Sequence, residues 1–123
     1  MPQAEFITNL EPNEVFVFGS NTAGRHGRGA ALQAREVFGA VYGVGEGHTG
    51  RCYAFPTLDA NLNKRSLTEL TESVQKLYTA CRENPEKIYL LTKVGCGIAA
   101  YPEETMRGLF VDHPANLILP IGW

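Results

Sequence analysis

The first residues able to do chemistry lie in a glycine-rich segment, Gly19–Gly29, which reads GSNTAGRHGRG. Nine of the 13 glycines lie between positions 19 and 50. Glycine permits positive φ and close approach of a ligand, so that backbone N–H groups of such a loop can face an anion. Arg25, His26 and Arg28 add cationic donors, and a helix expected to begin near Arg28 adds its partly positive N-terminus. The pattern predicts a diphosphate-binding loop, with a tight turn packed against the helix as the alternative.

This loop matches neither the P-loop pattern nor the strict Rossmann fingerprint. Asn21 can hydrogen-bond a ribose hydroxyl or cap the turn, and its type alone does not decide between the two roles. The residues of this loop that we expect to contact a ligand are Gly19, Ser20, Asn21, Arg25, Gly27, Arg28 and Gly29.

A second candidate loop, Thr92–Ile98 (TKVGCGI), follows an apolar run and precedes a helix expected to open at Pro102. In open α/β sheets, ligands bind outside the carboxyl ends of the strands. If the strands before the two loops are neighbours, the loops face each other and hold one phosphate chain from two sides. We expect Gly95, Cys96, Gly97 and Ile98 to contact the ligand, with Lys93 either offsetting phosphate charge or pointing to solvent.

Two side chains near the second loop have competing interpretations. A nucleophilic Cys96 needs a nearby base and a lowered pKa, and no histidine is close in sequence. We therefore favour a small residue packed in a tight loop. Tyr101 can stack on a base or a ribose, or it can simply cover the start of the following helix.

The elements that position these loops alternate along the chain. We predict strands at 14–18, 51–55 (closed by Pro56), 88–92 and 116–119, and helices at 28–38 (ended by Gly39), from 66 to about 84, and from Pro102. Ser66 and Glu69 form a capping box, and a stripe from Leu67 to Cys81 forms the apolar face of that helix. This order predicts an α/β fold with a mostly parallel sheet and helices on both faces.

The overall composition limits the classes of function. The 123 residues fit one domain, 1–123, and the net charge of −2 creates no field that attracts nucleic acid or an anionic membrane. The three cysteines show no metal-ligand spacing, so we expect reduced thiols and no metal or cofactor. No signal peptide and no apolar run of about 20 residues is present. We predict a cytoplasmic protein.

The two loops together resemble the paired loops of macrodomains, most closely those of the ADP-ribosyl-ester hydrolase branch, whose second loop also reads I-G-C-G. The similarity extends from about Val15 to Leu119, with specific matches only in the loops. It implies a three-layer α/β/α sandwich and an ADP-ribose-like ligand. By this resemblance Asn21 would meet the distal ribose, while the diphosphate would be surrounded by Gly27, Gly29, Gly95, Cys96, Gly97 and Ile98.

The sequence departs from that branch at both groups proposed for its catalysis. Ala99 stands where the branch has an acid, and Pro56–Asp59 stands where it has a lysine. Many macrodomains also hold adenine with an aspartate before an Ile-Thr pair, and Phe6 occupies that position here. The resemblance therefore transfers neither the catalytic mechanism nor adenine recognition.

Other residues could replace the missing catalytic groups. His26 is a candidate general acid or base near neutral pH, and Asp59 could orient a water molecule. Glu46 and His48 lie on the glycine-rich segment before the second predicted strand. The alternative, which we favour, is that all four are solvated loop residues. Gly43, Gly45, Gly47 and Gly50 form either a mobile flap or a plain flexible loop.

Three functions remain after these considerations. The first is binding of ADP-ribose, or a related phosphate-bearing nucleotide, free or on a macromolecule. The second is hydrolysis that removes ADP-ribose from a macromolecule, or phosphate from an ADP-ribose derivative, which requires His26 or Asp59. The third and weakest is RNA binding, against which the acidic pI and the lack of RNP-like aromatic strands argue.

Overall fold

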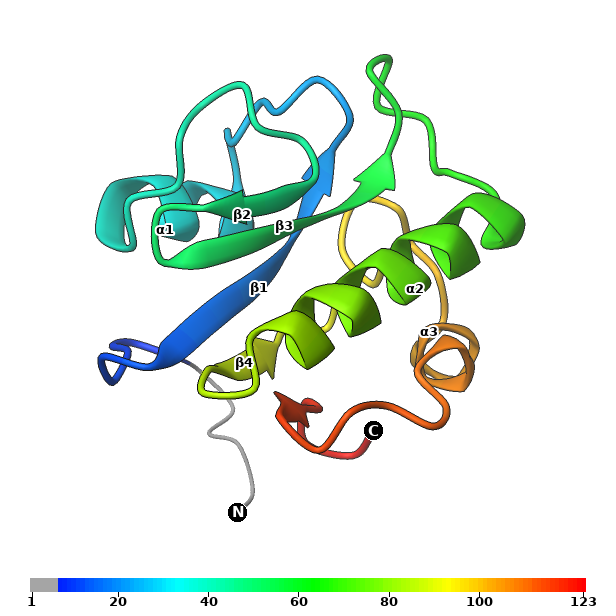
Figure 1. Cartoon of the computed structure of the whole chain (residues 1–123). Helices are drawn as coiled ribbons and strands as arrows, with labels where there is room; N and C mark the ends of the chain where they lie inside the picture. The colour runs from blue at the N-terminus through cyan, green and yellow to red at the C-terminus, as the bar shows by residue number, and fades with distance from the viewer. Residues whose placement is uncertain (1–6) are drawn as a thin grey trace.

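The computed structural model describes residues 7–123 (Figure 1). Phe6, at the expected adenine position, lies outside the described residues. The elements are β1 (Glu14–Asn21), α1 (Gly29–Val37), β2 (Gly47–Thr49), β3 (Cys52–Leu58), α2 (Leu67–Glu83), β4 (Ile88–Leu91), α3 (Glu103–Leu109) and β5 (Leu117–Ile118). In this part of the chain, no helix is both long and apolar enough to cross a membrane.

The strands form one sheet in the order β2-β3-β1-β4-β5. β3, β1, β4 and β5 are mutually parallel, and only β2 runs antiparallel to its neighbour. β1 pairs directly with β4, from Glu14 opposite Ile88 to Val17 opposite Leu91. The predicted α/β class with a mostly parallel sheet is therefore confirmed, and the strands before the two loops are neighbours.

Alternate side chains of β1 enter two separate hydrophobic clusters. Phe16 and Phe18 pack with Ala34 of α1, and Val15 and Val17 pack with α2 and α3. Because successive side chains of a strand point to opposite faces, the sheet is covered by α1 on one side and by α2 and α3 on the other (Figure 1). β1 is thus fixed from both faces over Val15–Phe18. The prediction that this strand ends at position 18 was wrong, because pairing with β3 continues β1 through Gly19 to Asn21.

The predicted helix boundaries follow from their caps. The Ser66 hydroxyl accepts from the Glu69 N–H (3.2 Å), and the Glu69 carboxylate accepts from the Ser66 N–H (3.0 Å), so the capping box is present at the start of α2. Gly39 takes φ 77 just after α1, as the left-handed end of that helix requires. The prediction that Leu67 belongs to the buried apolar face of α2 was wrong, because this residue lies in the first turn and is 43% exposed.

Two predictions around β3 were wrong. The strand does not stop before Pro56 but continues to Leu58, and Pro56 stands opposite Ser20 of β1. β2 pairs with β3 only as far as Ala54. Pro56, which has no N–H, therefore removes no hydrogen bond between β3 and β2. The glycine-rich segment also contains β2, a three-residue strand too short for any alternation pattern to reveal. Gly47 therefore belongs to the sheet rather than to a flap.

Candidate functional site

The loops that follow β1, β3 and β4 lie at the same end of the sheet (Figure 1). The carboxyl ends of these strands open into a cavity of about 640 Å³. A volume of this size falls within the range of small-molecule sites, about 300–1,000 Å³. The cavity is lined by Gly19, Ser20, Asn21, Arg25, Gly27, Arg28, Gly29, Ala30, Ala31, Thr57, Leu58, Leu62, Thr92, Lys93, Val94, Gly95, Gly97, Ile98 and Ala99. Both glycine-rich loops thus contribute to one cavity.

Most of the expected ligand contacts line this cavity, and two do not. Cys96 and Tyr101 are absent from its wall, whereas every other residue predicted for the two loops is present. The cavity has a third wall that was not predicted from the sequence. It contains Thr57, Leu58 and Leu62, from the end of β3 and the loop after it. This wall follows from the sheet order, because β3 is the parallel neighbour of β1 and its carboxyl end must lie at the same edge.

The second loop uses some of its backbone N–H groups internally and leaves others for a ligand. Cys96 donates to the Lys93 carbonyl (3.3 Å), Ala100 to the Gly97 carbonyl (2.9 Å), and Tyr101 to the Gly95 carbonyl (2.9 Å). By contrast, nothing within residues 7–123 accepts from the N–H groups of Gly97 or Ile98. Both residues are exposed and line the cavity, so their N–H groups are open to solvent or to an anion.

The first loop is held by Asn21. Its side-chain oxygen accepts from the Arg25 N–H (3.0 Å), and its amide nitrogen donates to the Arg25 carbonyl (2.9 Å). Of the two roles considered for Asn21, turn capping is thus present, while the ribose contact stays a prediction. The loop then leads to α1, where Arg28 at the N-cap is extended and makes no side-chain cap. The first N–H groups of α1 therefore have no helix partner of their own.

The glycines divide into two kinds by what a side chain would meet. A Cβ on Gly24 would lie 2.2 Å from the Gly43 carbonyl carbon, and one on Gly45 would lie 2.6 Å from the Asn21 carbonyl oxygen. These two glycines are required by packing. At Gly27 and Gly97 a Cβ would meet no atom of the described chain within 4 Å, although both line the cavity. Packing thus accounts for Gly24 and Gly45 but not for Gly27 and Gly97, for which ligand binding stays a prediction.

The charge of the cavity favours an anion. Arg25, Arg28 and Lys93 line it, and its wall contains no aspartate or glutamate among the described residues. Lys93 is partly neutralised by Glu103, at 3.3 Å in an exposed pair. Arg25 and Arg28 form no ion pair within residues 7–123 and are exposed to solvent. Arg25 and Arg28 therefore line the same cavity as Gly97 and Ile98, and no described carboxylate compensates their charge.

Neither candidate for acid–base catalysis lines the cavity. His26 is fully buried, with Nε2 3.0 Å from the Val44 carbonyl and the ring edge-on to Phe18. Its Nδ1 has no partner in the described part of the chain. Asp59 accepts from the N–H groups of Asn61 (2.8 Å) and Asn63 (3.0 Å), which closes the loop after β3. Both side chains hold loops in place. The favoured interpretation of His26 as a solvated residue was also wrong, because its ring is buried against Phe18.

The remaining chemical candidates also have structural partners. Burial raises the pKa of the Cys96 thiol, and the nearby Glu103 carboxylate adds to that rise, so little thiolate forms near neutral pH. The Tyr101 hydroxyl donates to the Arg65 carbonyl (2.6 Å), with the Lys64 ammonium 4.7 Å above the ring. The His48 Nε2 lies 2.7 Å from the Tyr89 hydroxyl, away from the cavity wall.

Comparison with known proteins returned no matching protein family, no matching characterised protein and no matching solved structure. The features of this chain that bear on its function are therefore the geometry and charge of the cavity at the ends of β1, β3 and β4.

Proposed function

We propose that this protein binds ADP-ribose, or a related phosphate-bearing nucleotide, in the cavity between its two glycine-rich loops. The observation that carries the proposal is the pairing of β1 with β4, which brings both loops to one cavity with three cationic side chains and no carboxylate on its described wall. In this proposal the fold is a macrodomain-like three-layer α/β/α sandwich, and the diphosphate lies between the loops.

The binding energy would come from several charge-assisted hydrogen bonds. Each hydrogen bond to a charged group contributes roughly 1.5–3 kcal/mol. Arg25 and Arg28 supply such donors, and the N–H groups of Gly97 and Ile98 add donors that no described residue uses. The start of α1, where Gly29 and Ala30 line the cavity, adds the partial positive charge of a helix N-terminus. The backbone donors need little reordering on binding, because internal hydrogen bonds hold both loops, whereas binding would order the exposed Arg25 and Arg28 side chains.

Binding without catalysis is favoured over hydrolysis by the composition of the wall. Among the described lining residues there is no carboxylate, imidazole or thiol to act as a general base or nucleophile. The hydroxyls of Ser20 and Thr92 donate to backbone carbonyls, of Gly45 and Val17 respectively. RNA binding is also disfavoured, since no aromatic side chain lines the described wall on which a base could stack.

The proposal is tested by isothermal titration of the protein with ADP-ribose, AMP and free ribose. We expect a saturable heat with ADP-ribose and none with ribose. Arg28→Met should weaken ADP-ribose binding about tenfold, the equivalent of one lost charge-assisted hydrogen bond. Arg107→Met on α3, outside the cavity wall, is the matched control and should bind normally. Absence of heat with millimolar ADP-ribose would refute the proposal, and release of ADP-ribose from a modified peptide would favour the hydrolase.

A further inference from the structure

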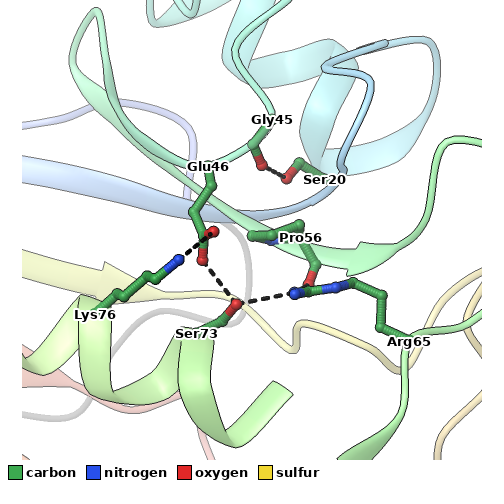
Figure 2. Close-up of polar contacts among 7 residues, drawn as sticks. All are labelled: Ser20, Gly45, Glu46, Pro56, Arg65, Ser73 and Lys76. Atoms are coloured by element: carbon green, nitrogen blue, oxygen red, sulfur yellow. Dashed lines mark hydrogen bonds and ion pairs between the residues drawn. The ribbon is translucent and has the colours of Figure 1, made fainter. Parts of the chain in front are cut away.

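A buried serine on α2 contacts Glu46, 27 residues earlier in the chain, and Arg65, which lies just before α2 (Figure 2). Ser73 is 1% exposed. Its hydroxyl donates to the Glu46 carboxylate (2.7 Å) and accepts from the Arg65 guanidinium (2.9 Å). We call Ser73, Glu46 and Arg65 the Ser73 cluster. The hydroxyl thus lies between a carboxylate and a guanidinium, an arrangement in which loss of one member leaves the others without their partner.

The Glu46 side of the cluster leads to the first loop. The residues just before Glu46 support that loop by three hydrogen bonds: Ser20 donates to the Gly45 carbonyl, His26 Nε2 lies 3.0 Å from the Val44 carbonyl, and the Gly43 N–H donates to the Gly24 carbonyl (2.8 Å). The two segments lie so close together that neither Gly24 nor Gly45 has room for a Cβ. A displacement of Glu46 would therefore be transmitted to the segment that follows β1.

The Arg65 side of the cluster leads to the second loop. The Arg65 carbonyl accepts from the Tyr101 hydroxyl (2.6 Å), and the Tyr101 N–H donates to the Gly95 carbonyl (2.9 Å). The Arg65 guanidinium also donates to the Pro56 carbonyl (2.8 Å), and its N–H to the Thr57 carbonyl (2.9 Å), at the end of β3. Arg65 is therefore attached both to the cavity wall and to the second loop.

We propose that the Ser73 cluster consists of positioning residues that set the spacing of the two loops and so give the site its preference for a diphosphate over a monophosphate. This inference rests on the proposed function. A diphosphate held from two sides needs both loops at a fixed separation, whereas a single phosphate can be held by one loop. Preorganisation of a site increases affinity by removing the cost of ordering it on binding. Loss of the cluster would thus lower the affinity for a diphosphate more than the affinity for a monophosphate.

The test compares ADP-ribose and AMP binding by calorimetry in wild type, Ser73→Ala and Glu46→Ala. We expect both variants to lose about tenfold in affinity for ADP-ribose and to bind AMP as wild type does. Glu46→Gln keeps an acceptor for the Ser73 hydroxyl and should recover most of the loss. Lys76→Ala is the matched control: Lys76 lies on α2 and contacts Glu46 at 3.4 Å, but its side chain is 66% exposed. Exposed pairs of this kind contribute little.

A second measurement does not depend on any ligand. Hydrogen exchange of the ligand-free protein should be faster in Ser73→Ala than in wild type at both 19–29 and 94–101, while the amides of β4 stay protected. Unchanged exchange in both loops would overturn the positioning role, as would equal losses of ADP-ribose and AMP affinity or full retention of both. Failure of wild type to bind ADP-ribose, with exchange altered as expected, would instead refute the proposed function and with it the diphosphate preference, and only the positioning of the loops by the cluster would stand.

Discussion

At the scale of single residues, the glycines of the two loops have different requirements. Gly24 combines φ 72 with backbone contact, whereas Gly27 and Gly97 have ordinary φ and open space beside them. Glycine is needed at the first position by the chain itself. At the other two positions nothing in the described chain requires glycine, and the need would come from a ligand that approaches the backbone closely.

This difference predicts opposite effects of valine substitution. Gly27→Val and Gly97→Val should fold with thermal stability near that of wild type but should lose ADP-ribose binding, because the branched side chain occupies space at the cavity. Gly24→Val should lower the unfolding temperature, because its Cβ would lie 2.2 Å from backbone. Thermal unfolding and calorimetry separate the two effects. Full affinity in Gly97→Val would show that the ligand does not lie against this loop.

The three thiols allow a prediction about reactivity. Burial raises the pKa of Cys52 and of Cys81 to about 12, and it also raises the pKa of Cys96. A raised pKa means less thiolate at a given pH, so iodoacetamide at pH 8 should label all three more slowly in the folded protein than in urea. Cys96, the only one of the three that is partly exposed, should react first. Faster labelling of Cys96 in the folded protein than in urea would restore the nucleophile interpretation.

At the scale of elements, α2 is the helix that the sequence specifies best. Its capping box, its apolar stripe and its stop at Asn84 were all readable because each depends on residues within one or two turns. β2 and the last residues of β3 were not readable, because they form only through pairing with distant strands. Gly47 and Pro56 oppose strand formation locally, and the tertiary pairing overrides them.

The cap of α2 gives a prediction with a pH dependence. Ser66→Ala should lower the free energy of unfolding by about 1 kcal/mol. Hydrogen bonds from the Ser66 N–H, and then from its hydroxyl, lower the pKa of Glu69 in the folded state. A carboxyl with a lowered folded pKa stabilises the protein above its unfolded pKa, and this contribution is lost as the pH falls through the folded pKa.

Urea unfolding of wild type and Glu69→Gln tests this sign. The wild type should be the more stable at pH 7, and the difference should shrink as the pH is lowered below the ordinary glutamate range. Gln75→Ala, which removes no charge from the exposed face of the same helix, is the control and should show no such change. A difference between wild type and Glu69→Gln that grows as the pH falls would contradict the assignment.

At the scale of the whole molecule, the sheet order decides the site. The two loops were predictable from their own residues, and their convergence followed only if β1 and β4 were neighbours, which the sheet order confirms. The third wall was not predicted, since the position of Leu62 depends on where β3 ends and on the loop that Asp59 closes. Local sequence patterns thus indicated the hydrogen-bond donors of the candidate site. The sheet order determines which segments form its walls.

The packing of the whole molecule also explains why the side chains of His26 and Asp59, the predicted catalytic residues, do not line the cavity. The sequence shows that His26 and Asp59 are titratable and that they lie in or beside loops around the cavity. It does not show where their side chains point. In the structure their side chains contact the backbone of neighbouring segments rather than the cavity wall. A side chain's direction depends on packing, so its chemistry cannot be assigned from sequence position alone.

The most direct test of the central claim is an NMR titration of the ¹⁵N-labelled protein with ADP-ribose. The account predicts saturable shifts of backbone amides in both loops, at Gly27–Ala30 and at Gly97–Ala99, with one common affinity, and little change in α2 or β5. Shifts confined to one loop, shifts elsewhere on the surface, or no shifts at saturating ADP-ribose would contradict a shared site for the diphosphate.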